Sequence, residues 1–499
     1  MAVNDNKYLI ALDIGTGSAK GLLYKIGGRV VCVRSQGYPT YYPGPGRVEQ
    51  DPQEILEAVV KVVGNLVSDN GLDPGSVSGL VFGGILHSFL PVDIKGDPLS
   101  KAMIWGDSRS TSQSDKIRSD LDTEDIKNRT GCSIHPLYFL PRLVWLKEQA
   151  PGIFKKLYKI ISIKEYIMLH LYGKFIVDRS IASGTGMLNM GTLDWDKDLM
   201  YYAGLKDEEL SPVVETTFKL KNLRKEYASK MGLLAGTPGV VGSSDGPCAH
   251  LATAGLSDTT MSITVGSSGA LRRKVSKPEV LPGLEAWCYY LTENNWLLGG
   301  VAHDAGIAIK WLFNNFFKNG SGEFESLDII DEYAKQTPPG SCGLLFFPFL
   351  GGERSPRYNP RARGTLIGMS YEHGKKHITR ALMEGISYRL YSNYKMLDPG
   401  EDMELVISGG ILKSPAWLQI TADFFGKNLR IPQVREASAY GTALIGLRAL
   451  GIIKITEINN YVKQSGAVAF DPDDHRIYLE IYRAYQENYT RLFVKKNRT

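Results

Sequence analysis

The sequence predicts an α/β protein that is built from two related halves. Helix-like and strand-like segments alternate from the start, as where the helical pattern of residues 51–69 precedes the strand-like run SGLVFGGI at 78–85. A turn rich in glycine and hydroxyl residues joins two apolar runs near residue 15, and the same pattern recurs near residue 266. A length of 499 residues allows about two to four domains. We therefore expect one domain over residues 1–250 and a second over 251–499.

The first turn lies in LIALDIGTGSAKGLLYK, residues 9–25, which reads as a β-hairpin with GTGS at its bend. Glycine turns present several backbone N–H groups together, so they bind anions such as phosphate without a dedicated cation. Asp13 ends the apolar strand before this turn. Because a buried carboxylate is costly unless a partner or a metal compensates its charge, Asp13 requires such a partner.

The middle of the chain repeats the pattern. PGVVGSSDGPCAH, residues 238–250, predicts a strand, a turn that carries Asp245, and a helix, and residues 259–275 predict another hairpin in which Gly266 takes the place of Gly15. A single glycine-rich turn is most often only a tight turn. Two turns in register in two halves are able to hold a polyphosphate from both sides, although a Walker A sequence is absent.

Two later segments extend this organisation. Residues 403–426 repeat the order of strand, glycine turn and helix. Residues 375–390 carry apolar side chains at helical spacing, which predicts a core helix and no site.

Composition excludes several classes of protein. The net charge of +5 is spread over the whole length, with basic and acidic residues mixed, so nucleic acid is not an expected partner. The five cysteines are scattered without CxxC spacing, which speaks against disulfides and zinc and favours a cytoplasmic location. No apolar stretch reaches the ~18 residues of a membrane span, so we expect no membrane partner either.

On these motifs the chain resembles the FGGY family of carbohydrate kinases. The resemblance is carried over nearly the full length by ALDIGTGSAK, GSSDGPCAH, TVGSSGA, PFLGGERSPRYNPRARGTLIGM and ISGGILKSPAWLQITADFFGK. Residues 364–384 follow one family signature except at Leu382, and residues 140–149 resemble the other, with Arg142 in place of its lysine. The resemblance implies two actin-like (ribonuclease H-like) domains flanking a central nucleotide and sugar cleft. It also implies ATP and Mg²⁺ as cofactors and leaves a homodimer open.

The resemblance implies roles for individual residues. Asp13 matches the carboxylate that helps to hold Mg²⁺, and Asp245 matches the catalytic base, which accepts the proton of the attacking hydroxyl. Without the resemblance, Asp245 reads equally as a helix N-cap, and so does Ser414. The positions that match the family's nucleotide-binding residues are Gly15, Thr16, Gly17, Ser18, Lys20, Gly266, Ser267, Gly306, Gly409, Gly410 and Ser414.

The substrate side is expected in residues 83–93 and 101–110. The family resemblance places His87, Trp105, Asp107, Arg109 and Asp245 against the sugar. The runs LHS, WGDSR and ASGTGMLNMGTLDWD are most similar to those of the gluconate kinases of the family, so D-gluconate is the expected substrate and 6-phosphogluconate the product. Gluconate is an anion that a bidentate arginine recognises well. Arg109 is the first candidate for that contact, followed by Arg142 and Lys164.

Two other functions remain open at this stage. One is a xylulokinase or another polyol or ketose kinase of the same family, with the same chemistry on a different alcohol. The other is a nucleotide-switched binding module of the actin or chaperone type, in which no metabolite accepts phosphate. The segment from Trp105 to Arg109, together with Asp245, argues against the switch. We also expect the two halves to close on substrate, which would limit transfer to water.

Overall fold

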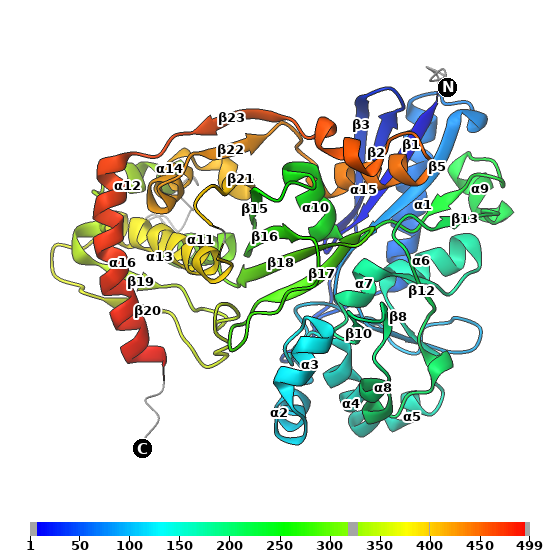
Figure 1. Cartoon of the computed structure of the whole chain (residues 1–499), viewed down its shortest axis with the longest axis horizontal. Helices are drawn as coiled ribbons and strands as arrows, with labels where there is room; N and C mark the ends of the chain where they lie inside the picture. Colours follow the sequence, from blue (N-terminus) through cyan, green and yellow to red (C-terminus); the bar gives the residue numbers. More distant parts are fainter. Residues whose placement is uncertain (1–6, 318–327, 399, 495–499) are drawn as a thin grey trace.

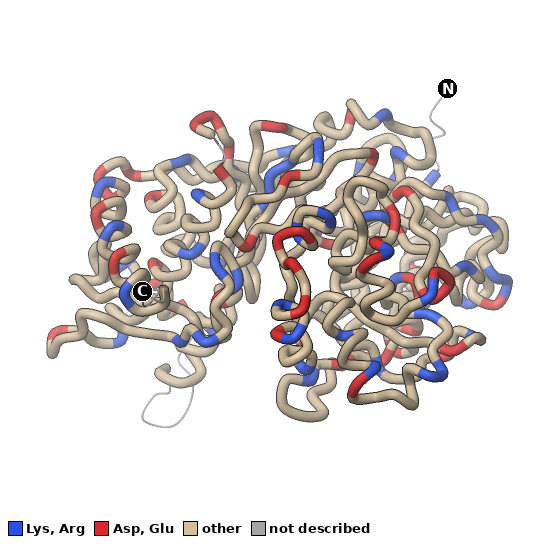
Figure 2. Tube along the Cα trace, turned by 60° about the horizontal axis from the view of Figure 1, so that its bottom comes forward, with Lys and Arg blue, Asp and Glu red and all other residues tan. Residues whose placement is uncertain are grey.

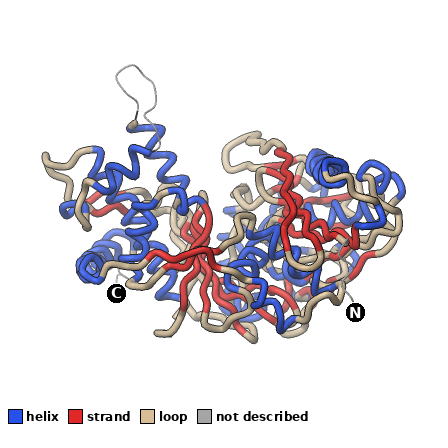
Figure 3. Tube along the Cα trace, turned by 90° about the horizontal axis from the view of Figure 1, so that it is seen from above, coloured by secondary structure: helices blue, strands red, loops and turns tan. Residues whose placement is uncertain are grey.

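The computed structural model describes residues 7–317, 328–398 and 400–494, which form two bodies that each contain a central sheet (Figure 1). In each body the strands run between helices (Figure 3). The first sheet has the order β13 (Lys219–Leu220), β14 (Gly239–Val240), β5 (Val77–Gly84), β1 (Tyr8–Ile14), β2 (Ser18–Lys25) and β3 (Arg29–Gly37). The second has the order β17 (Trp287–Thr292), β18 (Asn295–Ala302), β16 (Gly269–Val275), β15 (Thr260–Val265), β21 (Glu404–Gly409), β22 (Leu429–Pro432) and β23 (Gln464–Val468).

The two sheets share one arrangement of strands around each glycine turn. β1 pairs antiparallel with β2 and parallel with β5, while β15 pairs antiparallel with β16 and parallel with β21. Each turn therefore follows a strand that is enclosed by neighbours on both sides. The predicted two-domain α/β fold with a repeated hairpin is confirmed.

The first sheet is covered on both faces, because its central strands β1 and β5 carry apolar side chains toward both sides. Ile10, Leu12 and Ile14 face a core shared with α1 (Pro52–Asp69) and α6 (Ile163–Tyr172). Helix α1 begins where the Asp51 carboxylate accepts the backbone N–H of Gln53, as the preference of Asp for N-caps predicts.

The opposite face of that sheet is covered by a helix from the other end of the chain. Leu9 and Ala11 pack with α15 (Ala437–Ala449), which lies beside β1 and β2 in Figure 1. Helix α15 in turn packs against α10 (Asp245–Ala254), so closely that a methyl group on Gly441 would lie 1.9 Å from the carbonyl oxygen of Cys248. The halves therefore share a core, and the division into 1–250 and 251–499 is kept as a proposal.

The second sheet packs against a larger, aromatic core. The predicted core helix is present as the first part of α13 (Lys375–Met396), which lies in this core with α11 (Gly306–Phe316) and α14 (Pro415–Phe425). The last helix, α16 (Pro472–Phe493), runs along the outer edge of this body (Figure 1) and contributes Tyr478, Tyr482 and Tyr485.

The remaining elements form the substrate side and the periphery. They are β4 (Glu49–Gln50), β6 (Leu90–Val92), β7 (Ala102–Met103), α2 (Thr111–Asp120), α3 (Thr123–Thr130), α4 (Phe139–Gln149), α5 (Pro151–Phe154), β8 (Lys159–Ile161), β9 (Val177–Asp178), α7 (Arg179–Ser183), β10 (Leu188–Asn189), β11 (Asp194–Trp195), α8 (Lys197–Ala203), β12 (Val213–Val214), α9 (Lys225–Met231), α12 (Asp328–Lys335), β19 (Leu345–Phe347) and β20 (Thr365–Ile367). Acidic and basic residues are interspersed over both bodies (Figure 2). Among the helices of the described ranges, none has the length and apolar character that crossing a membrane requires.

Candidate active site

The first glycine turn is fixed by side chains from three other segments. The Tyr38 hydroxyl donates to the carbonyl of Gly15 at 2.5 Å, the Gln50 amide donates to the carbonyl of Thr16 at 2.5 Å, and the Trp105 indole N–H donates to the Thr16 hydroxyl at 3.0 Å. These bonds use carbonyl and hydroxyl oxygens of the turn. The turn is therefore rigid while its backbone N–H groups remain suited to an anion.

The second glycine turn is packed against the start of α11. The backbone N–H of Gly306 donates to the carbonyl of Gly266 at 2.9 Å, and that of Ile307 donates to the carbonyl of Ser267 at 3.1 Å. A Cβ atom at position 306 would lie 2.5 Å from the Gly266 oxygen, so only glycine fits there. The packing of the turn therefore explains why position 306 is glycine. The contact of Gly306 with a nucleotide, which the family resemblance implies, stays a prediction.

A third glycine segment follows β21. Gly409 has a φ of 96°, and a Cβ atom there would lie 2.5 Å from the carbonyl oxygen of Val265. Only glycine fits this position of the turn. Gly410 begins the single helical turn Gly410–Lys413. Ser414 then caps α14 by accepting the backbone N–H of Trp417 at 3.3 Å, and its hydroxyl donates to Asp331. The N-cap interpretation of Ser414 is therefore correct, and its contact with a nucleotide stays a prediction.

Asp13 and Asp245 lie close together at the junction of the two bodies. Burial is the main cause that raises the pKa of Asp13 from its ordinary value of 3.8 to about 7, and the nearby negative charge of Asp245 is the second. The Oδ1 atom of Asp13 is buried and has no hydrogen-bond partner. Two carboxylates that share a buried site, one of them with an unsatisfied oxygen, form an arrangement that is suited to a divalent cation.

Asp245 is the first residue of α10 and accepts the backbone N–H of Gly246 at 2.8 Å. Burial raises its pKa, whereas the backbone N–H groups of Gly246 and Leu86 and the charge of Arg272 act in the opposite direction. The Arg272 guanidinium lies against Gly246, where an added Cβ would be 3.1 Å from Nη2, and its Nε is buried without a partner. Burial thus raises the proton affinity of the Asp245 carboxylate, and its hydrogen bonds and Arg272 oppose that effect.

Two further charged groups complete this cluster. The Lys20 ammonium lies 2.6 Å from the Glu436 carboxylate, and both side chains are about one third exposed. Lys20 lowers the pKa of Asp13, and Glu436 raises it. Glu436 immediately precedes α15, so this ion pair joins the first glycine hairpin to a helix from the second half of the chain.

The region expected to bind the substrate contains a group of aromatic rings around His87. Its backbone is in the left-handed region, with a φ of 64°, and its Nδ1 lies 2.7 Å from the carbonyl of Gly184. The ring lies 5.4 Å from Tyr138 and 6.0 Å from Tyr289, whose hydroxyls are 2.7 Å apart. Burial, followed by the charge of Arg354, lowers the pKa of His87 to about 3, so the imidazole is neutral.

The charge of Arg109 is balanced within the protein. Its guanidinium forms ion pairs with Asp107 at 2.7 Å and with Glu49 at 2.6 Å. Asp107, which is 2% exposed, also accepts the backbone N–H of Val48 at 2.8 Å. Asp107 and Arg109 therefore act on each other and on the β4 segment, and this geometry favours a positioning role for Arg109 over direct recognition of a carboxylate.

Arg142 and Lys164, the other two cations considered for gluconate, are both completely buried. Arg142 donates to the backbone carbonyls of His87 and Ile104, each at 2.6 Å, and burial lowers its pKa to about 9. Lys164 pairs with the equally buried Asp178 at 2.8 Å. Neither cation is available to a ligand, so the expectation that they contact gluconate is corrected: both stabilise the loops of the site.

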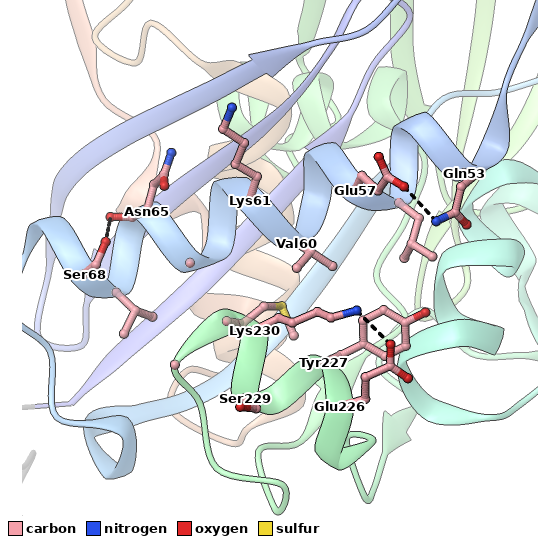
Figure 4. A pocket seen from close by; sticks show the side chains of 15 residues that line it. Gln53, Glu57, Val60, Lys61, Asn65, Ser68, Glu226, Tyr227, Ser229 and Lys230 are labelled. Carbon is pink, nitrogen blue, oxygen red and sulfur yellow. Dashed lines mark hydrogen bonds and ion pairs between the residues drawn. The ribbon is translucent and has the colours of Figure 1, made fainter.

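An open pocket between α1 and α9 lies outside this region (Figure 4). Four of its polar side chains form two pairs, Gln53 with Glu57 at 3.0 Å and Lys230 with Glu226 at 2.8 Å. None of the residues expected to bind nucleotide or sugar lines it.

Two glycine hairpins on equivalent strands of two like sheets, with Asp13 and Asp245 close together, are the arrangement expected of a phosphotransferase. The model of the FGGY family of carbohydrate kinases matches residues 8–252 with its N-terminal domain and residues 261–450 with its C-terminal domain. The chain belongs to this family and is an ATP-dependent sugar kinase.

The similar proteins include gluconokinases and xylulose kinases. The gluconokinase of Bacillus subtilis (strain 168) is 34% identical over 457 residues, which cover 89% of this chain and 88% of the relative. The xylulose kinase of the same organism is 27% identical over 491 residues, 97% of each chain. Among solved structures, gluconate kinase from Lactobacillus acidophilus has a TM-score of 0.91 at 29% identity, over 97% of this chain and 98% of that one. Ligand-bound xylulose kinase from the same organism has a TM-score of 0.92 at the same identity and coverage.

Proposed function

We propose that this kinase transfers the γ-phosphoryl group of ATP to the terminal hydroxyl of D-gluconate and forms 6-phosphogluconate. The juxtaposition of Asp13 and Asp245 between the two glycine turns carries the kinase chemistry. The higher identity to a gluconokinase than to a xylulose kinase, 34% against 27%, supports the substrate.

The two glycine turns are proposed to hold the phosphates of ATP. Residues Gly15 to Ser18 with Lys20 bind from the first body, and Gly266 with Ser267 bind from the second. Gly306, Gly409, Gly410 and Ser414 are proposed to line the adenosine side. Because the turns come from strands in equivalent positions of the two sheets, they approach the same ligand from opposite sides.

Asp245 is proposed to act as the general base. The terminal hydroxyl oxygen of gluconate attacks the γ-phosphorus, the bond from that phosphorus to the β–γ bridging oxygen breaks, and ADP leaves with the bridging oxygen. The hydroxyl proton passes to the Asp245 carboxylate. The positive charge of Arg272 favours the ionised form of this carboxylate and so opposes the effect of burial, which raises the pKa of Asp245.

The carboxylates fit Mg²⁺, with Asp13 as the proposed ligand on the buried Oδ1 that has no hydrogen-bond partner. Among the described residues there is no group of three or more His, Cys, Asp or Glu side chains arranged as metal ligands. Mg²⁺ commonly takes one or two carboxylates and completes its shell with phosphate oxygens and water. When bound, Mg²⁺ neutralises part of the charge on the phosphates.

A substrate panel with coupled detection of ADP tests the proposal. D-gluconate should give a kcat/KM at least tenfold above D-xylulose, D-ribulose and glycerol. A preference for D-xylulose would instead support the second candidate, a xylulokinase, which the TM-score of 0.92 to a solved xylulose kinase keeps in view. Rapid ATP turnover that needs no polyol would favour a nucleotide-switched module.

Replacing the base gives a second test. Asp245→Asn should bind MgATP normally and lose about 10² to 10⁴ in kcat, the usual contribution of general base catalysis. Asp69→Asn, at the exposed end of α1, is the matched control and should retain full activity. Full activity of Asp245→Asn would remove Asp245 from this role.

We further propose a cytoplasmic location, which the five cysteines without a disulfide and the use of ATP support. A homodimer is a prediction that light scattering of the purified protein measures directly.

A further inference from the structure

The loop that follows β19 holds its central residue in a fixed position. Glu353 and Asn359 form two backbone hydrogen bonds with each other, at 2.9 and 3.0 Å, which close the loop. The Ser355 hydroxyl donates to the carbonyl of Glu285 at 2.5 Å, which ties the loop to the segment before β17. Arg354 lies between Glu353 and Ser355, whose positions these hydrogen bonds fix.

A buried arginine of α13 fixes both neighbours of Arg354. Arg389, which is 4% exposed, donates to the Glu353 carboxylate at 2.5 Å and also to the carbonyl of Ser355. The Tyr489 hydroxyl donates to the second oxygen of Glu353 at 2.6 Å. A buried ion pair of this kind is strongly destabilising to break, so the backbone of Arg354 is rigid before any ligand arrives.

Arg354 itself is half-buried, and its guanidinium makes no hydrogen bond or ion pair with any residue of the described ranges. It lines a small pocket together with His135, Tyr138 and Trp287, and it borders His303 on its other side. Glu285 lines the same pocket without forming an ion pair with it. A partly desolvated cation without a counterion favours an anionic ligand.

The histidines around this cation are neutral hydrogen-bonding groups. Burial, followed by the charge of Arg354, lowers the pKa of His135 and brings that of His303 to about 4, and the same two causes act on His87. These imidazoles therefore do not compete for an anion and are suited to hydroxyl groups. A fixed guanidinium beside neutral imidazoles is suited to a polyhydroxy acid.

The pocket continues from the catalytic base. Leu86, whose backbone N–H lowers the pKa of Asp245, precedes His87, and the ring of His87 lies 5.4 Å from Tyr138. Tyr138 in turn lines the pocket of Arg354. An extended six-carbon acid with its terminal hydroxyl at Asp245 would direct its carboxylate along this path.

We propose that Arg354 binds the carboxylate of the sugar acid and so sets the preference of the kinase for an acid over a neutral sugar. This inference rests on the proposed function. The neighbouring cations support it by exclusion. Arg109, Arg142 and Lys164 are paired within the protein, and Arg118 pairs with Asp115 at 2.7 Å. Arg272 lies beside Asp245.

The test compares D-gluconate with its neutral analogue D-gluconamide on the complete enzyme. For the wild type, kcat/KM should favour the acid by about 30- to 100-fold, the range expected for charge-assisted hydrogen bonds. In Arg354→Gln that preference should fall below threefold through a higher KM for gluconate, with gluconamide changed by less than threefold. Arg354→Lys should restore part of the preference. Arg357→Gln, on the same loop and exposed, is the matched control and should behave as the wild type.

The outcomes separate the two proposals. A wild type that does not phosphorylate gluconate overturns the proposed function. A wild type that does so, while Arg354→Gln keeps the preference for the acid, overturns this inference alone. A fall in kcat that is equal for both substrates would place Arg354 on the transferred phosphoryl group and also overturn it. If Arg354→Gln fails to fold, the test uses Arg354→Lys. In that variant, a KM for gluconate and a thermal stabilisation by gluconate that both equal those of the wild type would contradict the proposal.

Discussion

Replacing Asp13 by asparagine should make the protein without nucleotide more stable above neutral pH while it abolishes activity. The pKa of the Asp13 carboxyl lies near 7 in the folded protein, against 3.8 ordinarily. That difference corresponds to about 4 kcal/mol, which is the upper limit of the cost of ionising Asp13 without a cation. Asparagine has nearly the same shape and carries no charge, so Asp13→Asn removes this cost.

The sign of the pH dependence follows from proton binding. Between pH 4 and 7 the folded protein keeps a proton on Asp13 that the unfolded chain has lost, so wild-type stability falls as the pH rises through this window. The difference in unfolding free energy between Asp13→Asn and the wild type should be near zero at pH 4. It should grow toward a limit of about 4 kcal/mol at pH 8.

Urea denaturation in EDTA at pH 5, 6, 7 and 8 measures this difference, and Glu480→Gln, an exposed carboxylate on α16, serves as the charge control with a flat response. Activity of Asp13→Asn with MgATP should fall by at least about 10³, since the phosphates lose their positioned cation. A stability difference that is flat across this range, or an Asp13→Asn protein less stable than the wild type at pH 8, would refute the reasoning.

Two stability predictions follow from buried contacts. Lys164→Met should destabilise the protein by about 3–5 kcal/mol, because it leaves the buried Asp178 carboxylate unpaired. The double variant Lys164→Met with Asp178→Asn should recover part of that loss. Urea denaturation measures both, and a loss below about 1 kcal/mol in Lys164→Met would contradict the prediction. Gly441→Ala should destabilise by about 1–3 kcal/mol or more, because its methyl group would meet the Cys248 carbonyl at 1.9 Å. The control is Gly466→Ala, because nothing lies within 4 Å of the methyl group added there. Equal thermal denaturation midpoints for the two variants would show that α10 and α15 move apart without loss of stability.

The features that the sequence predicted correctly are local ones. Both hairpins and the helix at residues 375–390 follow from periodicity and glycine turns within about 25 residues of chain. Asp13 lies near the end of β1 and Asp245 begins α10, which follows β14 of the same sheet, so the two roles that the family resemblance implied fall on residues close in space. The cap at Ser414 is local as well, since Pro415 follows it directly.

The features that the sequence did not predict depend on distant partners. The guanidinium of Arg109 is balanced by Glu49, which lies 60 residues earlier in the chain. Glu436 meets Lys20 from 416 residues away, and no periodic signal connects them. Arg354 looked like any other arginine of a family motif, because its lack of a partner is visible only once the surrounding loops are in place. Arg272 carried one weak signal, since it shares a strand face with Ala270 beside the second glycine turn.

The placement of α15 on the first sheet bears on how the chain assembles during synthesis. Leu9, Ala11 and Leu22 are made early, whereas the helix that covers them ends at Ala449. At the usual pace of about 5–20 residues per second, the ribosome adds the intervening stretch over about 20–90 seconds, during which that apolar face is bare. A nascent chain of this design therefore depends on a chaperone or on temporary self-contacts, and a gene cut near its middle should yield an insoluble fragment that regains solubility when the missing piece is supplied.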